Sequence, residues 1–139
     1  MGPPATRTLS HAQDVYAALR AAGLPDAAVR MVAAQSAFET AGWSGLWNWN
    51  LGNITQPNAG QAVYQPGNAL PFAQYPDVNA GARALVQMLA RGYPDAIPAA
   101  VAGDLPRYVA ALKLGGYAGK DANYDAYEAG MARYMGSLP

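Results

Sequence analysis

Apolar and polar positions recur with a helical period of three to four residues in six separate segments of the chain. The first begins at Ser10, which forms a capping-box pattern with Gln13, and the second opens at Pro25 and Asp26, residues favoured in a first helical turn. Prolines, glycines and capping residues bound the others. The pattern predicts helices over residues 10–23, 25–40, 77–92, 94–103, 104–115 and 123–135.

Between the second and third predicted helices, residues 40–76 contain no Asp, Glu, Lys or Arg. This stretch is rich in Asn, Gln, Gly and Pro, and its short β-prone pieces "AVY" and "FAQY" favour a small hairpin over a helix. We therefore expect a mainly α protein in which a loop or β lobe over residues 41–76 is inserted among about six helices. With 139 residues and no long linker, residues 1–139 are expected to form one domain, with 1–9 flexible.

Composition excludes several classes of function. The net charge is zero and only 13% of residues are charged, so no basic surface for nucleic acid is expected. No apolar run approaches the roughly 20 residues that cross a bilayer, and we expect no membrane insertion. Cysteine is absent and His11 is the only histidine. Acids at 121, 125 and 128 are explained by the start of a helix, so we expect no metal and no cofactor.

Glu39 is the residue that this pattern does not explain. At 100° per residue it shares a helix face with Gln35, Val32 and Ala28, while Arg30 lies on the opposite side. An apolar setting and the negative end of the helix dipole both raise a carboxyl pKa, which favours the protonated form. A carboxyl that is protonated near neutral pH can act as the general acid of glycoside cleavage, whereas a lone glutamate near a helix end is often simply exposed.

The uncharged stretch after Glu39 favours the functional interpretation. Aromatic faces stack on sugar rings, and amide groups bond to their hydroxyls and acetamides. We therefore expect Trp47, Trp49, Asn50 and Tyr64 to contact a polysaccharide in a groove between the lobe and the helices. Core packing is the alternative for each tryptophan, and it is the better explanation for Trp43.

The segment "AAQSAFETAGWSG" followed by "NLGNI" resembles the lysozyme-like superfamily, in particular the flagellar-type peptidoglycan β-N-acetylglucosaminidases. That family carries an "A-Q-x-A-x-E-[ST]-x-W-G" helix end and then an "N-L-x-[GN]-I" segment. The similarity continues in "FAQYPDVNAGARALVQML" and in "LKLGGYAGKDANYDAYEAGMARYM", and it covers about residues 25–135.

The resemblance implies a lysozyme-like α+β fold that cleaves β-1,4 links of the peptidoglycan glycan strand. Glu39 takes the position of the catalytic acid, and Asn53 that of a residue lining the adjoining sugar subsite. Tyr117 and Tyr124 match groove tyrosines of the family. Gln35, one turn before the acid, either orients it or belongs to the core.

The chain departs from this family in its second acid. Many related enzymes place an Asp or Glu in the lobe to activate water, whereas the next acid after Glu39 is Asp77, which we expect to cap the third helix. Three routes remain: Glu39 acting as acid and then base with the substrate 6-hydroxyl as nucleophile, assistance from the substrate acetamide, or a water held by Asn and Tyr groups. The rival is a non-catalytic glycan-binding or structural module that retains the fold.

The partner expected from these inferences is a peptidoglycan glycan strand, bound by a monomer. Because this substrate lies in the periplasm or cell wall and the sequence contains no export signal, we expect delivery by a phage, by a partner or by a separate export route. Membership of a larger virion or secretion assembly is compatible with this expectation.

Overall fold

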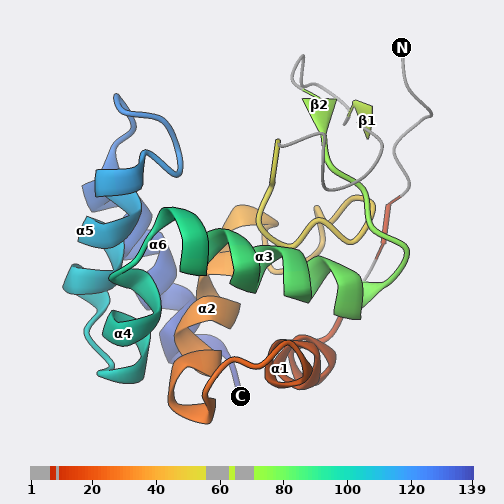
Figure 1. Cartoon of the computed structure of the whole chain (residues 1–139), viewed down its shortest axis with the longest axis horizontal. Coiled ribbons are helices and arrows are strands. Elements are labelled where there is room, and N and C mark those ends of the chain that lie inside the picture. Colours follow the sequence, from red (N-terminus) through yellow and green to blue (C-terminus); the bar gives the residue numbers. More distant parts are fainter. Residues whose placement is uncertain (1–6, 9, 56–62, 65–70) are drawn as a thin grey trace.

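The computed structural model describes residues 7–8, 10–55, 63–64 and 71–139, without the side chains of 63, 64 and 71. The described chain is mainly helical, as predicted (Figure 1). Each predicted helix is present within a few residues of its expected bounds. The helices are α1 (Ala12–Ala21), α2 (Asp26–Glu39), α3 (Val78–Gly92), α4 (Ala96–Val101), α5 (Leu105–Gly115) and α6 (Tyr124–Ser137).

Side-chain caps begin three of these helices. Asp77 Oδ1 accepts a hydrogen bond from the Ala80 amide at 2.8 Å, which confirms the capping role expected for this acid. Asp104 and Asn123 cap α5 and α6 in the same way, at 3.1 and 3.0 Å. Gly116, with φ 71°, ends α5 in the left-handed conformation that glycine adopts without strain.

The capping box predicted at Ser10 and Gln13 does not form. α1 begins after His11, which provides no side-chain cap, and the Ser10 hydroxyl is buried without a hydrogen-bond partner among the described residues. Just before it, the Thr8 amide bonds to the Leu46 carbonyl at 2.9 Å, which holds Thr8 against a segment distant in sequence.

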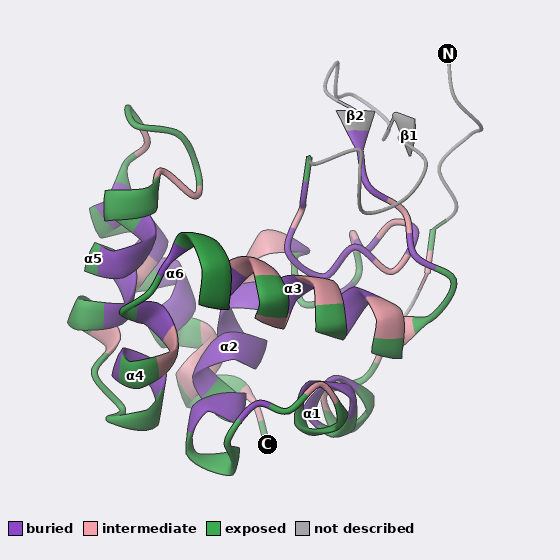
Figure 2. Cartoon of the chain, in the orientation of Figure 1, coloured by how far each residue is buried: buried purple, intermediate pink, exposed green. Residues whose placement is uncertain are grey.

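Helix α2 is the centre of the molecule, because it packs against α1, α4 and α6. Nine of its residues are buried, and Figure 2 shows it as the most completely buried helix in that view. Alanines 28, 33, 34 and 37 are all fully buried, and their small side chains let three neighbouring helices approach it closely. The end of α2 is therefore rigidly placed.

A loop formed by residues 41–55 lies against the start of α3. Gly81 permits the close approach, since a Cβ added there would lie 1.9 Å from the Trp49 carbonyl oxygen. On its other side, the Trp49 amide donates to Thr8 Oγ1 at 3.2 Å, and Arg7 Nε donates to the Ser44 carbonyl at 2.8 Å. Arg7 and Thr8 are therefore tied to this loop, which differs from the flexibility expected for residues 1–9.

Two short antiparallel strands follow this loop, β1 (Val63–Tyr64) and β2 (Pro71–Phe72). They pair Val63 with Phe72, and they lie at the end of the molecule away from α4 and α5 (Figure 1). β1 lies within the β-prone piece "AVY", whereas β2 shares only Phe72 with the piece "FAQY". Among the described residues, no helix has both the length and the apolar character needed to span a membrane.

Replacing Gly81 by alanine tests the contact between α3 and the loop. An alanine inside a helix usually adds up to about 1 kcal/mol of stability over glycine. Here the added methyl overlaps the Trp49 carbonyl, so we expect Gly81→Ala to lower the free energy of unfolding by about 1–3 kcal/mol or more. Gly136→Ala in α6 is the matched control, because no atom lies within 4 Å of its added Cβ. Urea denaturation that found both variants equally stable would refute the contact.

Candidate functional site

Glu39 occupies the last turn of α2, and its side chain is partly exposed. The Tyr127 hydroxyl, from α6, donates to Glu39 Oε1 at 2.5 Å. Asn53, from the 41–55 loop, donates through Nδ2 to Glu39 Oε2 at 3.0 Å and to the Glu39 backbone carbonyl at 2.8 Å. One donor on each oxygen fixes the orientation of the carboxyl group.

Two opposing effects set the pKa of Glu39. Burial is the larger and raises the pKa, because the ionised form loses hydration. The hydrogen bonds from Tyr127 and Asn53 lower it, because they stabilise the carboxylate. The net shift is upward, as the sequence predicted. Arg30 does not oppose it, since its guanidinium bonds to the Met135 and Leu138 carbonyls at the end of α6.

The Tyr127 phenol is held in its protonated form, which can donate a hydrogen bond. Burial and then the nearby Glu39 charge raise the pKa of its phenol far above the usual range. Asn53 is held in the left-handed region at φ 51°, which asparagine tolerates better than most residues. Its Oδ1 has no hydrogen-bond partner among the described residues, so it is available to accept one from a ligand.

Two buried polar side chains, Gln35 and Tyr108, lie in the core next to Tyr127, the partner of the Glu39 carboxyl. Gln35 is fully buried, its Oε1 accepts from the Tyr108 hydroxyl, and its side chain lies close enough to Tyr127 to lower the pKa of that phenol. Gln35 Nε2 makes no well-formed hydrogen bond within the described chain. Of the two roles expected for it, Gln35 therefore has that of a core residue, and its full burial leaves no surface for a substrate to contact.

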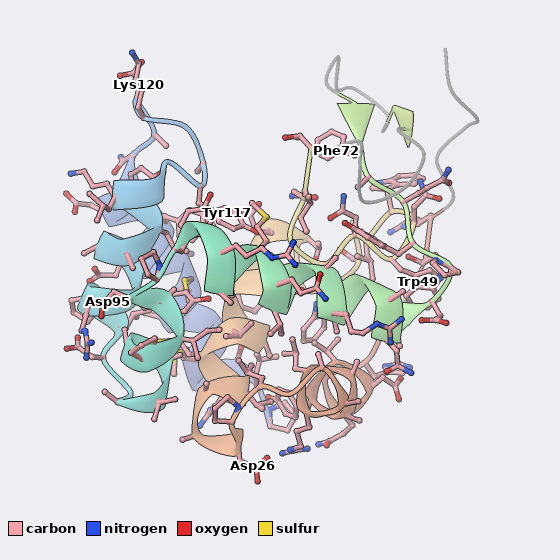
Figure 3. The ribbon with its side chains drawn as sticks, in the orientation of Figure 1. Asp26, Trp49, Phe72, Asp95, Tyr117 and Lys120 are labelled. Carbon is pink, nitrogen blue, oxygen red and sulfur yellow. The ribbon has the colours of Figure 1, made fainter. Side chains whose placement is uncertain are left out.

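Tyr117, one of the two tyrosines that the resemblance singles out, lies near enough to Glu39 to feel its charge. Burial raises its pKa well above the usual value, and the next cause is the charge of Glu39. Its hydroxyl donates to the Gly52 carbonyl at 2.7 Å, which anchors the loop beside Asn53. Figure 3 shows Tyr117 above α3 near the middle of the molecule.

The structure assigns other roles to Asn50 and Tyr124. Asn50 is fully buried, and its amide bonds only to backbone groups of Ile54 and Ala73. The Tyr124 hydroxyl accepts from the Ala118 amide and donates to the Gly119 carbonyl, both at 3.0 Å. Both side chains hold turns together, so neither is free to bind a substrate as predicted.

None of the three tryptophans is among the hydrogen-bond partners that Glu39 has in the described part of the chain. Trp43 is buried and donates to Ser36 Oγ at 3.0 Å, which agrees with the structural role expected for it. Trp49 lines a separate hollow between α1 and the start of α3, far from Tyr117 (Figure 3). Trp47 is partly exposed, and its backbone pairs with Arg7. Tyr64 lies in β1, but its side chain is outside the described residues.

Tyr127 is the site residue that sequence reasoning missed. Asn123 caps α6, so positions 124, 127 and 131 share one helix face, and all three are buried. The resemblance in the segment "LKLGGYAGKDANYDAYEAGMARYM" indicated Tyr124, which lies at the start of that face. A helical wheel drawn from the cap also indicates Tyr127, but nothing in the local sequence shows that it meets α2.

No second acid joins Glu39 in the described part of the chain. Asp77, the next acid in sequence, is engaged as the cap of α3. Across residues 7–8, 10–55 and 71–139, no cluster of three or more His, Cys, Asp or Glu side chains could hold a metal ion. The groups that meet at this site are one carboxyl, one phenol and one amide, and a carboxyl in this setting can transfer a proton.

Searches of family models, of curated proteins and of solved structures find no match to this chain. The geometry of the site and the sequence resemblance are therefore what supports a function.

Tyr127→Phe tests the hydrogen bond to the carboxyl. Removing a donor that favours the ionised form should move the pKa of Glu39 further upward. The chain contains two glutamates, so selective ¹³Cδ labelling gives two carboxyl resonances, and Glu39→Gln assigns them. Tyr134→Phe, also in α6, is the control and should leave the titration unchanged. A Glu39 pKa that stays constant or falls in Tyr127→Phe contradicts the geometry.

The raised pKa also predicts how stability depends on pH. The folded protein retains the Glu39 proton to higher pH than the unfolded chain does, so the native state loses stability as pH rises through this window. Relative to the native protein, Glu39→Gln should therefore gain stability from the ordinary glutamate range up to the raised pKa, and level off above it. Urea unfolding at steps from pH 3.5 to 8 measures this difference. Glu128→Gln is the matched variant, and an identical pH trend in both would sink the prediction.

Proposed function

We propose that this protein cleaves β-1,4 links between N-acetylglucosamine and N-acetylmuramic acid in peptidoglycan glycan strands, with Glu39 as the general acid. The observation that carries the proposal is a partly exposed carboxyl whose pKa is raised by burial and whose two oxygens each accept one hydrogen bond. A side chain directed into bulk water, or one fully enclosed by protein, would not serve this purpose. Glu39 is neither.

The fold is compatible with a lysozyme-like assignment. A buried central helix ends at the acid, and two short strands lie between it and the next helix. The resemblance in sequence places the acid at the same helix end and Asn53 beside it. Asn53 donates a hydrogen bond to the Glu39 carboxyl. The two residues are 14 positions apart, so their contact depends on the fold and not on local sequence.

In the proposed reaction, protonated Glu39 donates its proton to the glycosidic oxygen as the bond from that oxygen to the anomeric carbon breaks. The resulting carboxylate is stabilised by Tyr127 and Asn53. It then removes a proton from the group that attacks the anomeric carbon. That group is either the 6-hydroxyl of the same sugar, which gives an anhydro end, or a water, which gives a reducing end.

The second half-reaction uses Glu39 again because residues 40–76 contain no acid. Asn53, whose Nδ2 is engaged by Glu39, would use its Oδ1 to position a hydroxyl or an acetamide of the substrate. The substrate places the protein's action in the periplasm or cell wall. Delivery by a phage, a partner or an export route remains part of the proposal.

Fragment release from purified cell walls tests this function. Native protein should release muropeptides, and Glu39→Gln, which has no proton to donate, should lower the rate by about 10²–10⁴-fold. Glu128→Gln removes the other glutamate and should retain activity. Mass spectrometry of the ends separates the reactions, since anhydro ends indicate a transglycosylase, reducing N-acetylglucosamine ends a glucosaminidase, and reducing N-acetylmuramic acid ends a muramidase.

Two results would replace the proposal. If native protein and Glu39→Gln both bind walls and neither releases fragments, the protein is a non-catalytic glycan-binding module. If Glu39→Gln releases fragments at the native rate, another residue carries the chemistry.

A further inference from the structure

An open hollow lies beside Phe38, the residue that precedes Glu39 in α2. It has a volume of about 360 Å³ and is formed between the end of α2 and the last turns of α6. Its lining residues are Phe38, Ala41, Gly130, Arg133, Tyr134 and Ser137. This volume lies within the range of about 300–1,000 Å³ that is usual for ligand sites.

The hollow is joined to the carboxyl site by direct contacts. The Phe38 ring packs edge-on against Tyr127 with centroids 4.6 Å apart, and Tyr127 donates to Glu39. Gly130 allows this arrangement, because a Cβ added there would lie 2.1 Å from the Phe38 ring. A single aromatic layer therefore separates the proposed catalytic acid from the hollow.

The chemistry of the lining is that of a site for a carboxylate on a partly apolar body. Arg133 is exposed and forms neither an ion pair nor a hydrogen bond with any described residue. Phe38 and Tyr134 provide apolar surface beside it. A guanidinium recognises a carboxylate through two parallel hydrogen bonds, which a neutral sugar does not offer.

We infer that this hollow, with Arg133 as its cation, binds a carboxylate carried by the glycan strand next to the bond that Glu39 cleaves. The inference rests on the proposed function. Peptidoglycan offers this carboxylate in two places, on the stem peptide or on the lactyl group of N-acetylmuramic acid once the peptide is removed. Both are absent from chitin oligosaccharides, which share the same sugar linkage.

Binding to three ligands distinguishes these sources. Affinities are measured in the Glu39→Gln background, which needs no turnover, for peptide-bearing strands, for strands stripped of peptide by an amidase, and for chitin oligosaccharides. Adding Arg133→Gln should weaken binding of a carboxylate-bearing strand about tenfold and leave chitin oligosaccharides unchanged. Arg133→Lys, which retains the charge but not the fork, should restore part of the loss. Arg91→Gln, at an exposed arginine of α3 outside the hollow, is the charge-matched control.

If Arg133→Gln weakens binding of peptide-bearing strands alone, the carboxylate that Arg133 binds is on the stem peptide. If it weakens binding of stripped strands, that carboxylate is on the lactyl group. An equal loss on all three ligands, no loss on any, or the same effect from Arg91→Gln overturns the inference. Wall cleavage by the native protein is a separate measurement. A failure of cleavage alone therefore contradicts the proposed function, while a failure of this selectivity alone contradicts the role of Arg133.

Discussion

The balance between burial and hydrogen bonding at one carboxyl is the constraint on which the site depends. Burial of Glu39 favours its protonated form, while Tyr127 and Asn53 favour its ionised form. These three residues come from α2, α6 and the 41–55 loop, so the balance exists only when all three elements are packed together. A small displacement of either partner would shift the pKa and would also free the carboxyl to rotate. Precise packing of α2 is therefore a requirement of this pKa balance as well as of stability.

The loop that delivers Asn53 is unusually strained for its length. Five non-glycine residues between positions 41 and 53 have positive φ, namely Ala41, Trp43, Asn48, Trp49 and Asn53. Such conformations are unfavourable for bulky side chains and persist only where the surroundings determine them. The surroundings here are specific, since Trp43 bonds to Ser36 and the Trp49 carbonyl lies over Gly81. Contacts with α2 and α3 thus maintain this strained backbone. In this conformation the Asn53 side chain reaches the Glu39 carboxyl.

Local chemistry explains why the helices were predictable and part of the site was not. Asp77, Asp104, Asn123 and Gly116 act within one turn of their own positions, so their roles can be read from neighbouring residues. Glu39 was identified because its helix face lacks a cation, which is also a local property. The roles of Tyr127 and Asn50 depend on segments that are distant in sequence. Tyr127 bonds to Glu39, 88 residues away, and Asn50 bonds to the carbonyl of Ala73. Ser10 was misassigned as a cap, since α1 begins after His11 and the Ser10 hydroxyl has no partner among the described residues.

The absence of an acid from residues 40–76 has a physical consequence for any proton-transfer role of Glu39. A group that serves first as acid and then as base must hold its proton before bond cleavage and accept one afterwards. Burial alone would make the carboxylate left after donation too unstable, and strong donors alone would leave the carboxyl ionised from the start. The hydrogen bonds to Oε1 and Oε2 lower the pKa of Glu39 by less than burial raises it, so the net shift of this pKa is upward. A single carboxyl in this setting can therefore exchange protons in both directions, which a reaction without a second acid requires.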